Sequence, residues 1–256
     1  MNRRTIVGFD RRLDLEWLDA TAGQVAAGAD AAAIRTYLDH LLSSILAGGA
    51  DRGARDKTIT LLVRIWRLVP DEVKPLRDRA LALLPGLTQD GRLAAHWAMV
   101  VATYPFFADV AGIAGRLLAL QGDVTSAQII QRVTETWGAR STTDRAARRV
   151  IRSMVQWGVL ADAAEKGTYH VAGLPRRLTE EVAELLVEAL LLDAGGAALT
   201  VPHLANHPAL FPFQLTLNPH YLSRDPRFDV QRQGLDVDLV MLAEPPLRRV
   251  VQVGMW

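Results

Sequence analysis

The sequence contains no cysteine, which excludes disulfide bonds, thiolate metal sites and cysteine nucleophiles. It also has little excess charge of either sign, because 29 lysines and arginines nearly balance 28 aspartates and glutamates, for a formal net charge of +1. Proteins that coat nucleic acids through bulk electrostatics are usually more basic than this. Any nucleic-acid binding by this chain must therefore depend on a local basic patch.

Targeting and catalytic motifs are also missing. The first residues, MNRRTIVGFDRRLD, include basic side chains but no apolar stretch of the kind that a signal peptide needs. The apolar stretch 97–115 has the length of a membrane span, but it contains Pro105 and Asp109, and a carboxylate in lipid is costly. No glycine-rich phosphate loop, serine-nucleophile motif or suitably framed pair of carboxylates occurs. We therefore expect a cytoplasmic protein with no membrane association, no enzymatic activity, no catalytic residue, no cofactor and no metal.

The apolar pattern predicts a mainly α protein in three parts. Residues 1–108 show the helical spacing of buried side chains, as at Ile34, Leu38 and Leu42, and form a helical N-terminal region. Residues 109–174 form a central domain, considered below. Residues 175–256 begin with an amphipathic helix capped by Thr179 and continue as a small β-rich tail, with strands expected at 213–218, 227–234, 235–244 and 248–256.

The central domain carries clear boundary signals. Thr125 is followed three residues later by Gln128, the spacing of a capping box, and Gly138 ends the helix that they start. Ser141 and Asp144 repeat the spacing, so a second helix is expected from 141 to 157. Two short strands, 159–163 and 168–172, then flank a four-residue turn, which is typical of a β-hairpin.

The order of helix, linker, helix, tight turn, longer helix and hairpin resembles the winged-helix branch of the helix-turn-helix superfamily. The likeness covers about seventy residues, near 110–175, and is carried by Thr125, Ile129, Ile130, Val133, Gly138, Thr143, Val150, Ile151, Met154 and WGVL at 157–160. A weaker likeness, from the aromatic ATYPFF helix that precedes this domain, is to the small helical winged-helix proteins of BREX-type phage-defence islands. The resemblance implies a winged-helix domain at 109–174 that binds double-stranded DNA with its second helix in the major groove.

The expected binding residues are mostly arginines on that helix. Arg145, Arg148, Arg149 and Arg152 share one helical face, opposite Ala147, Val150, Ile151 and Met154. Arginine can neutralise phosphates and donate two hydrogen bonds to guanine, and hydroxyls at a helix start can hold phosphate. The candidate DNA-binding residues are therefore Arg140, Thr142, Thr143, Arg145, Arg148, Arg149, Arg152 and, at the tip of the hairpin, Lys166.

Other functions remain open at this point. The arginine face could instead dock onto an acidic protein partner, in a scaffold, or simply be solvated, and weak DNA binding would call for protein partners or a homodimer. His203 and His207 have the spacing of a helical metal pair, but prolines bracket them and no third ligand is placed. The hairpin expected from Asp238 onward is similar to the core of PD-(D/E)XK nucleases, but Gln252 begins the stretch where the acid-x-lysine motif should lie. That similarity implies at most a degenerate nuclease.

Overall fold

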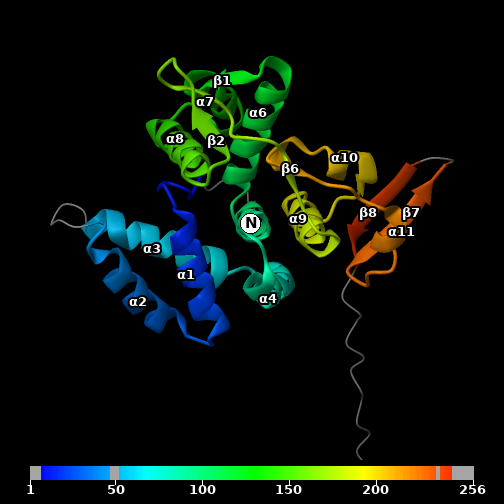
Figure 1. Ribbon diagram of the computed structural model, residues 1–256, viewed down its shortest axis with the longest axis horizontal. Helices are drawn as coiled ribbons and strands as arrows, with labels where there is room; N and C mark the ends of the chain where they lie inside the picture. The colour runs from blue at the N-terminus through cyan, green and yellow to red at the C-terminus, as the bar shows by residue number, and fades with distance from the viewer. Residues whose placement is uncertain (1–6, 47–51, 235–236, 244–256) are drawn as a thin grey trace, which may run out of the picture.

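The computed structural model describes residues 7–46, 52–234 and 237–243, and helices make up most of them, as the sequence predicts. In the described residues, the N-terminal unit has five α-helices, which lie at the lower left and centre of Figure 1. They are α1 (Leu15–Ala26), α2 (Ala31–Ser43), α3 (Arg52–Trp66), α4 (Lys74–Leu83) and α5 (Gln89–Thr103). Their buried faces carry the apolar residues expected from the helical spacing, including Ile34, Leu38 and Leu42.

The central unit consists of three helices and a three-stranded antiparallel sheet (Figure 1). Its elements are α6 (Pro105–Gln121), β1 (Asp123–Thr125), α7 (Ser126–Trp137), α8 (Ser141–Gln156), β2 (Leu160–Asp162) and β3 (Thr168–Val171). β3 lies between the other two strands, so that Val124 of β1 and Asp162 of β2 both face Tyr169 in the register. The expected hairpin is therefore present, and β1 extends it by a third strand that the sequence pattern did not indicate.

The two helix starts in this unit differ in their capping. At α7 the expected capping box is present: the Thr125 hydroxyl accepts a hydrogen bond from the Gln128 N–H, and the Gln128 side chain accepts one from the Thr125 N–H. At α8 the helix begins at Ser141 as expected, but the capping role assigned to Ser141 and Asp144 is wrong. Arg140 is the N-cap residue, and no side chain caps the helix.

The C-terminal unit begins with a long buried helix and ends in short strands. Its elements are β4 (Arg176–Arg177), α9 (Glu180–Asp193), β5 (Leu199–Thr200), α10 (Val201–Ala205), β6 (Phe213–Gln214), α11 (Pro219–Leu222), β7 (Phe228–Gln233) and β8 (Val237–Leu242). β4 pairs in parallel with β6, and β8 pairs with both β5 and β7. The small β-rich tail is thus present, with the β7–β8 hairpin at the right of Figure 1. The strand expected at 248–256 lies outside the described residues.

Aromatic side chains join the three units. Trp97 of α5 is fully buried and contacts Phe107 of α6, Trp157 after α8 and Phe213 of β6, with ring centroids 5.0–5.9 Å apart. The indole N–H of Trp97 also donates a hydrogen bond to the Ala209 carbonyl in the C-terminal unit. Such rings contribute large buried area and favourable edge-to-face contacts. The hydrophobic core is therefore continuous from one unit to the next.

The stretch considered above as a membrane span is a bent pair of helices. No single helix among the described residues is long and apolar enough to cross a bilayer. α5 and α6 reach that length and composition only together, and they meet at an angle of 118°. The break lies at Tyr104 and Pro105, where α6 starts with proline in its first turn.

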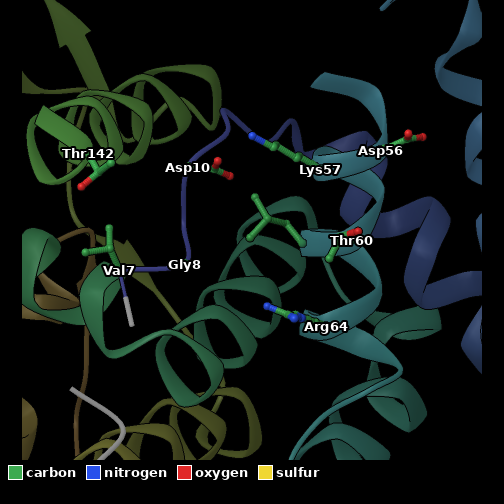
Figure 2. A pocket seen from close by; sticks show the side chains of 9 residues that line it. Val7, Gly8, Asp10, Asp56, Lys57, Thr60, Arg64 and Thr142 are labelled. Atoms are coloured by element: carbon green, nitrogen blue, oxygen red, sulfur yellow. The ribbon is translucent and has the colours of Figure 1, made fainter. Parts of the chain in front are cut away.

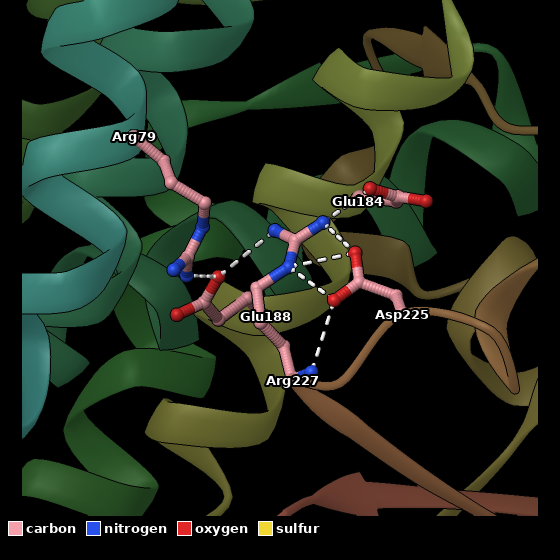
Figure 3. A network of polar contacts seen from close by, with 5 residues as sticks. All are labelled: Arg79, Glu184, Glu188, Asp225 and Arg227. Atoms are coloured by element: carbon pink, nitrogen blue, oxygen red, sulfur yellow. Dashed lines mark hydrogen bonds and ion pairs between the residues drawn. The ribbon is translucent and has the colours of Figure 1, made fainter.

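A network of charged side chains joins α9 and the segment before β7, both in the C-terminal unit, to α4 of the N-terminal unit (Figure 3). Glu188 of α9 is only 4% exposed, and it accepts hydrogen bonds from Arg79 of α4 and Arg227 before β7. Arg227 also pairs with Glu184 and Asp225. The hydrogen bonds from Arg227 hold the pKa of Asp225 below its ordinary value, whereas burial raises the pKa of Glu184. Three carboxylates therefore share the guanidinium groups of Arg79 and Arg227. Glu188 neutralises part of the charge of both.

We expect Glu188→Ala to lower the free energy of unfolding by about 3 kcal/mol, because it leaves half-buried Arg79 without its carboxylate. Urea denaturation measures the change. Glu181→Ala is the matched control on the same helix, because Glu181 is exposed and its removal should cost little. Equal stabilities for the two variants would contradict the role assigned to Glu188.

Two glycines of α6 make a second test of the packing. A Cβ atom at Gly115 would collide with the Pro208 carbonyl oxygen, whereas one at Gly112 would meet its nearest neighbours at an ordinary 3.8 Å. Gly115→Ala should therefore destabilise the fold by about 2 kcal/mol through overpacking. Gly112→Ala should be neutral or stabilising, because alanine is the better helix former. Thermal melts of the two variants compare them directly, and a Gly115→Ala protein as stable as wild type would show that α6 and residues 208–211 are not in close contact.

Candidate nucleic-acid interface

α8 has one buried face and one exposed face, as the spacing of its residues predicts. Val150 and Met154 are fully buried, and Ile151 is only 1% exposed. The opposite face is exposed and carries Arg145, Arg148, Arg149 and Arg152. Because the apolar face packs into the core, the four guanidinium groups must point away from it. The structure thus brings the four predicted arginines together on one surface.

The segment before α1 fixes α8 against the N-terminal unit. The Leu13 N–H donates a hydrogen bond to the Ser153 hydroxyl of α8 at 2.9 Å, and the Leu13 carbonyl accepts one from the Trp157 indole at 2.8 Å. Leu13 itself is fully buried. Both backbone groups of one buried residue are therefore satisfied by the second half of α8 and its end, which sets the direction in which the arginine face points.

The arginines of this surface differ in how much of their hydrogen-bonding capacity is free. Arg152 forms an ion pair with Asp162 of β2 at 3.2 Å. Burial opposes the charge of Arg152, but Asp162 together with the Tyr169 side chain outweighs it and raises the pKa of the guanidinium. Arg145 donates to the Ser141 carbonyl. Within the described part of the chain, the guanidinium groups of Arg148 and Arg149 have no hydrogen-bond or ion-pair partner, so they are the side chains most available to a ligand.

The other predicted binding residues are divided between exposed and buried positions. Arg140 and Thr142 are exposed at the start of α8, and Lys166 is exposed in the turn between β2 and β3. Thr143 is fully buried, so its assignment as a phosphate ligand is wrong. Its position explains this: Thr143, Ala147, Val150 and Met154 follow the i, i+4, i+7, i+11 spacing of the apolar face.

A cleft between α3 and α8 adds basic residues that the sequence analysis missed (Figure 2). This α3–α8 cleft has a volume of about 380 Å³, and Thr142 of α8 lines one side of it. Lys57, Thr60 and Arg64 line the other side from α3, and the segment from Val7 to Asp10 runs between the two. Lys57, Thr60 and Arg64 are spaced i, i+3, i+7, so the sequence did contain the signal of a shared polar face. It did not indicate that this face lies beside α8.

The alternative sites have little support in the structure. The rings of His203 and His207 lie 5.1 Å apart, but His207 accepts a hydrogen bond from the Ala209 N–H and so caps a short turn. Burial lowers the pKa of His207 to about 4. No group of three potential metal ligands occurs among the described residues. Asp238 lies on β8, and Gln252 falls outside the described part of the chain.

The buried position of Thr143 leads to a testable difference from Thr142. The Thr143 hydroxyl is buried and has no hydrogen-bond partner among the described residues. An unsatisfied buried hydroxyl is costly, so Thr143→Val should raise the free energy of unfolding by about 1 kcal/mol. Thr142→Val, on the exposed side, should leave stability nearly unchanged. Thermal unfolding separates the two, and a marked loss of stability in Thr143→Val would show that the hydroxyl does have a partner.

Comparisons with known proteins do not assign the chain to a family. No protein-family model, no curated protein and no solved structure matches the chain. The function of the arginine surface must therefore be inferred from its geometry and charge.

Proposed function

We propose that the central unit is a winged-helix domain that binds double-stranded DNA without catalysing a reaction. The order α6, β1, α7, α8, β2, β3 and the strand order β1–β3–β2 support this proposal. In the helix-turn-helix arrangement, the second helix of the pair enters the major groove. Here that helix is α8, and the observation that carries the proposal is its exposed face of arginines, of which Arg148 and Arg149 are unpaired within the described residues.

In the proposed complex, the exposed face of α8 lies in the major groove. Arg148 and Arg149 donate hydrogen bonds to phosphates or to the O6 and N7 atoms of guanine, for which the planar guanidinium is well suited. Arg145 adds a charge on the same face, and Arg140 and Thr142 hold phosphate near the start of the helix. Arg152 contributes less, because its ion pair with Asp162 would have to be shared or broken.

The hairpin limits the expected affinity. Lys166 is its one basic residue near the tip, and Glu165 lies next to it. Asp162 on β2 adds another negative charge near α8. A protein with this surface would bind DNA moderately and would gain from a second copy or from protein partners. We therefore propose that it acts as a regulator or as the DNA-contacting subunit of a larger assembly, of which a phage-defence complex is an example.

Docking onto an acidic protein is the second candidate. The Arg152–Asp162 pair supports it, because this surface already binds one carboxylate. The two candidates differ in their ligand: DNA binding requires affinity for a duplex alone, whereas docking requires a stable complex with a partner protein and no such affinity.

Fluorescence anisotropy with a labelled duplex tests the proposal. Wild type should bind at low salt, and the double variant Arg148→Ala/Arg149→Ala should bind at least tenfold more weakly. Each phosphate contact contributes about 0.9 to the slope of log affinity against log salt, so this slope should become shallower by up to about 2.

The control should remove the same charge elsewhere. Lys74→Ala/Arg224→Ala changes two exposed basic residues that lie outside the central unit and the α3–α8 cleft. It should bind like wild type. Absence of duplex binding by wild type at low salt, or equal affinities for wild type and the α8 variant, would contradict the proposal.

A further inference from the structure

We propose that the α3–α8 cleft receives one sugar–phosphate strand of the same duplex, and that Lys57 and Arg64 contact its phosphates. This inference rests on the proposed function, because it places the strand beside a helix that occupies the major groove. In this proposal, α3 of the N-terminal unit contacts the DNA in addition to α8.

The first argument is the charge of the cleft. Figure 2 shows the side chains of Lys57 and Arg64 extending from α3 toward the segment that contains Val7 and Gly8. Asp56 also lines the cleft, but its carboxylate points away from that segment. Lys57 has no ion-pair partner among the described residues. Asp10, the other acid of the cleft, lies 3.5 Å from the Arg11 guanidinium. Its charge is therefore partly compensated, and the α3 wall is left with two cations facing the cleft.

Tyr104, the tyrosine beside Arg64, brings no negative charge to the cleft. This tyrosine lies near Arg64, and burial raises the pKa of its hydroxyl to about 12. The phenol is therefore neutral at physiological pH and does not cancel the guanidinium charge. Arg64 itself is exposed on α3, so a ligand in the cleft can reach it.

The second argument is the flank of α8 that borders the cleft. Thr142, Arg145 and Arg149 follow the i, i+3, i+7 spacing of one helical row. Thr142 lines the cleft, and Ser153, four residues beyond Arg149, is bound to Leu13 of the N-terminal segment. This row of α8 therefore runs along the N-terminal unit, and its two arginines lie on the side of the arginine surface that is nearer to α3.

The third argument is the shape of DNA. The major groove is about 12 Å wide and has a phosphate strand along each edge, so a helix that fills it brings each of its flanks close to a strand. On the flank toward α3, that strand meets a cleft of about 380 Å³ with Lys57 and Arg64 on its α3 side and the Thr142 hydroxyl on its α8 side. An extended polyanion satisfies more of these cations at once than a single small anion does, and the regular spacing of duplex phosphates favours DNA over an acidic peptide.

The test measures how duplex affinity depends on salt for substitutions in α3. We expect Lys57→Gln and Arg64→Gln each to weaken binding about three- to tenfold at 0.1 M salt and to make the salt slope shallower by about 0.9. The effect should be the same for duplexes of different sequence, because phosphates carry no base identity. Arg64→Lys should keep the wild-type slope, because it keeps the charge.

The controls separate this inference from the proposed function. Lys74→Gln removes a lysine outside the cleft and should bind like wild type, and melting temperatures confirm that each variant is folded. If Arg148→Ala/Arg149→Ala weakens binding while Lys57→Gln and Arg64→Gln do not, the cleft is not part of the interface and only the proposed function stands. If wild type binds a polyglutamate peptide but no duplex, both are overturned in favour of an acidic protein partner.

Discussion

The position of α8 depends on one buried residue of the N-terminal segment. Leu13 binds Ser153 through its N–H and Trp157 through its carbonyl, across 140 and 144 residues of sequence. A buried backbone group without a partner is costly, so the segment cannot leave α8 without exposing or orphaning these groups. The same contact places residues 7–10 between α3 and α8. The direction of the arginine surface and the existence of the cleft therefore have a common structural cause.

Aromatic contacts also hold the C-terminal end of α8 against the rest of the core. Trp157 packs against both Trp97 and Phe107, while its indole N–H holds Leu13. Any rotation of α8 would therefore disturb the core of the N-terminal unit as well as its own packing. If α8 binds DNA as proposed, a helix held in this way presents its side chains without first ordering its backbone, which lowers the entropic cost of association. The flexible arginine side chains are the part that would still have to be ordered on binding.

The helical spacing and the capping residues predicted much of the arginine surface from the sequence. The parts that depend on contacts between distant segments could not be predicted. The i, i+3, i+4, i+7 rule placed the four arginines of α8 opposite Val150 and Met154, and the Thr125–Gln128 spacing identified the start of α7. The same rule places Thr143 on the buried face. Thr143 was wrongly predicted to bind phosphate because the prediction relied on its hydroxyl instead of its helical position. The contact of Leu13 with Ser153 joins distant segments and leaves no periodic signal. Lys57 and Arg64 could therefore be recognised as one face of α3, but their position beside α8 could not.

A small net charge is compatible with DNA binding if the cations are concentrated where the phosphates lie. The formal charge of the whole chain is +1, yet several of its acids form ion pairs elsewhere, such as Glu184, Glu188 and Asp225 around Arg227. Six exposed basic residues border or face one surface: Arg145, Arg148, Arg149 and Arg152 on α8, and Lys57 and Arg64 on α3. Screening at physiological salt reaches about 8 Å, so a phosphate strand at this surface interacts mainly with these neighbours and not with the distant carboxylates. The distribution of charge, more than its sum, therefore decides which ligand this protein can hold.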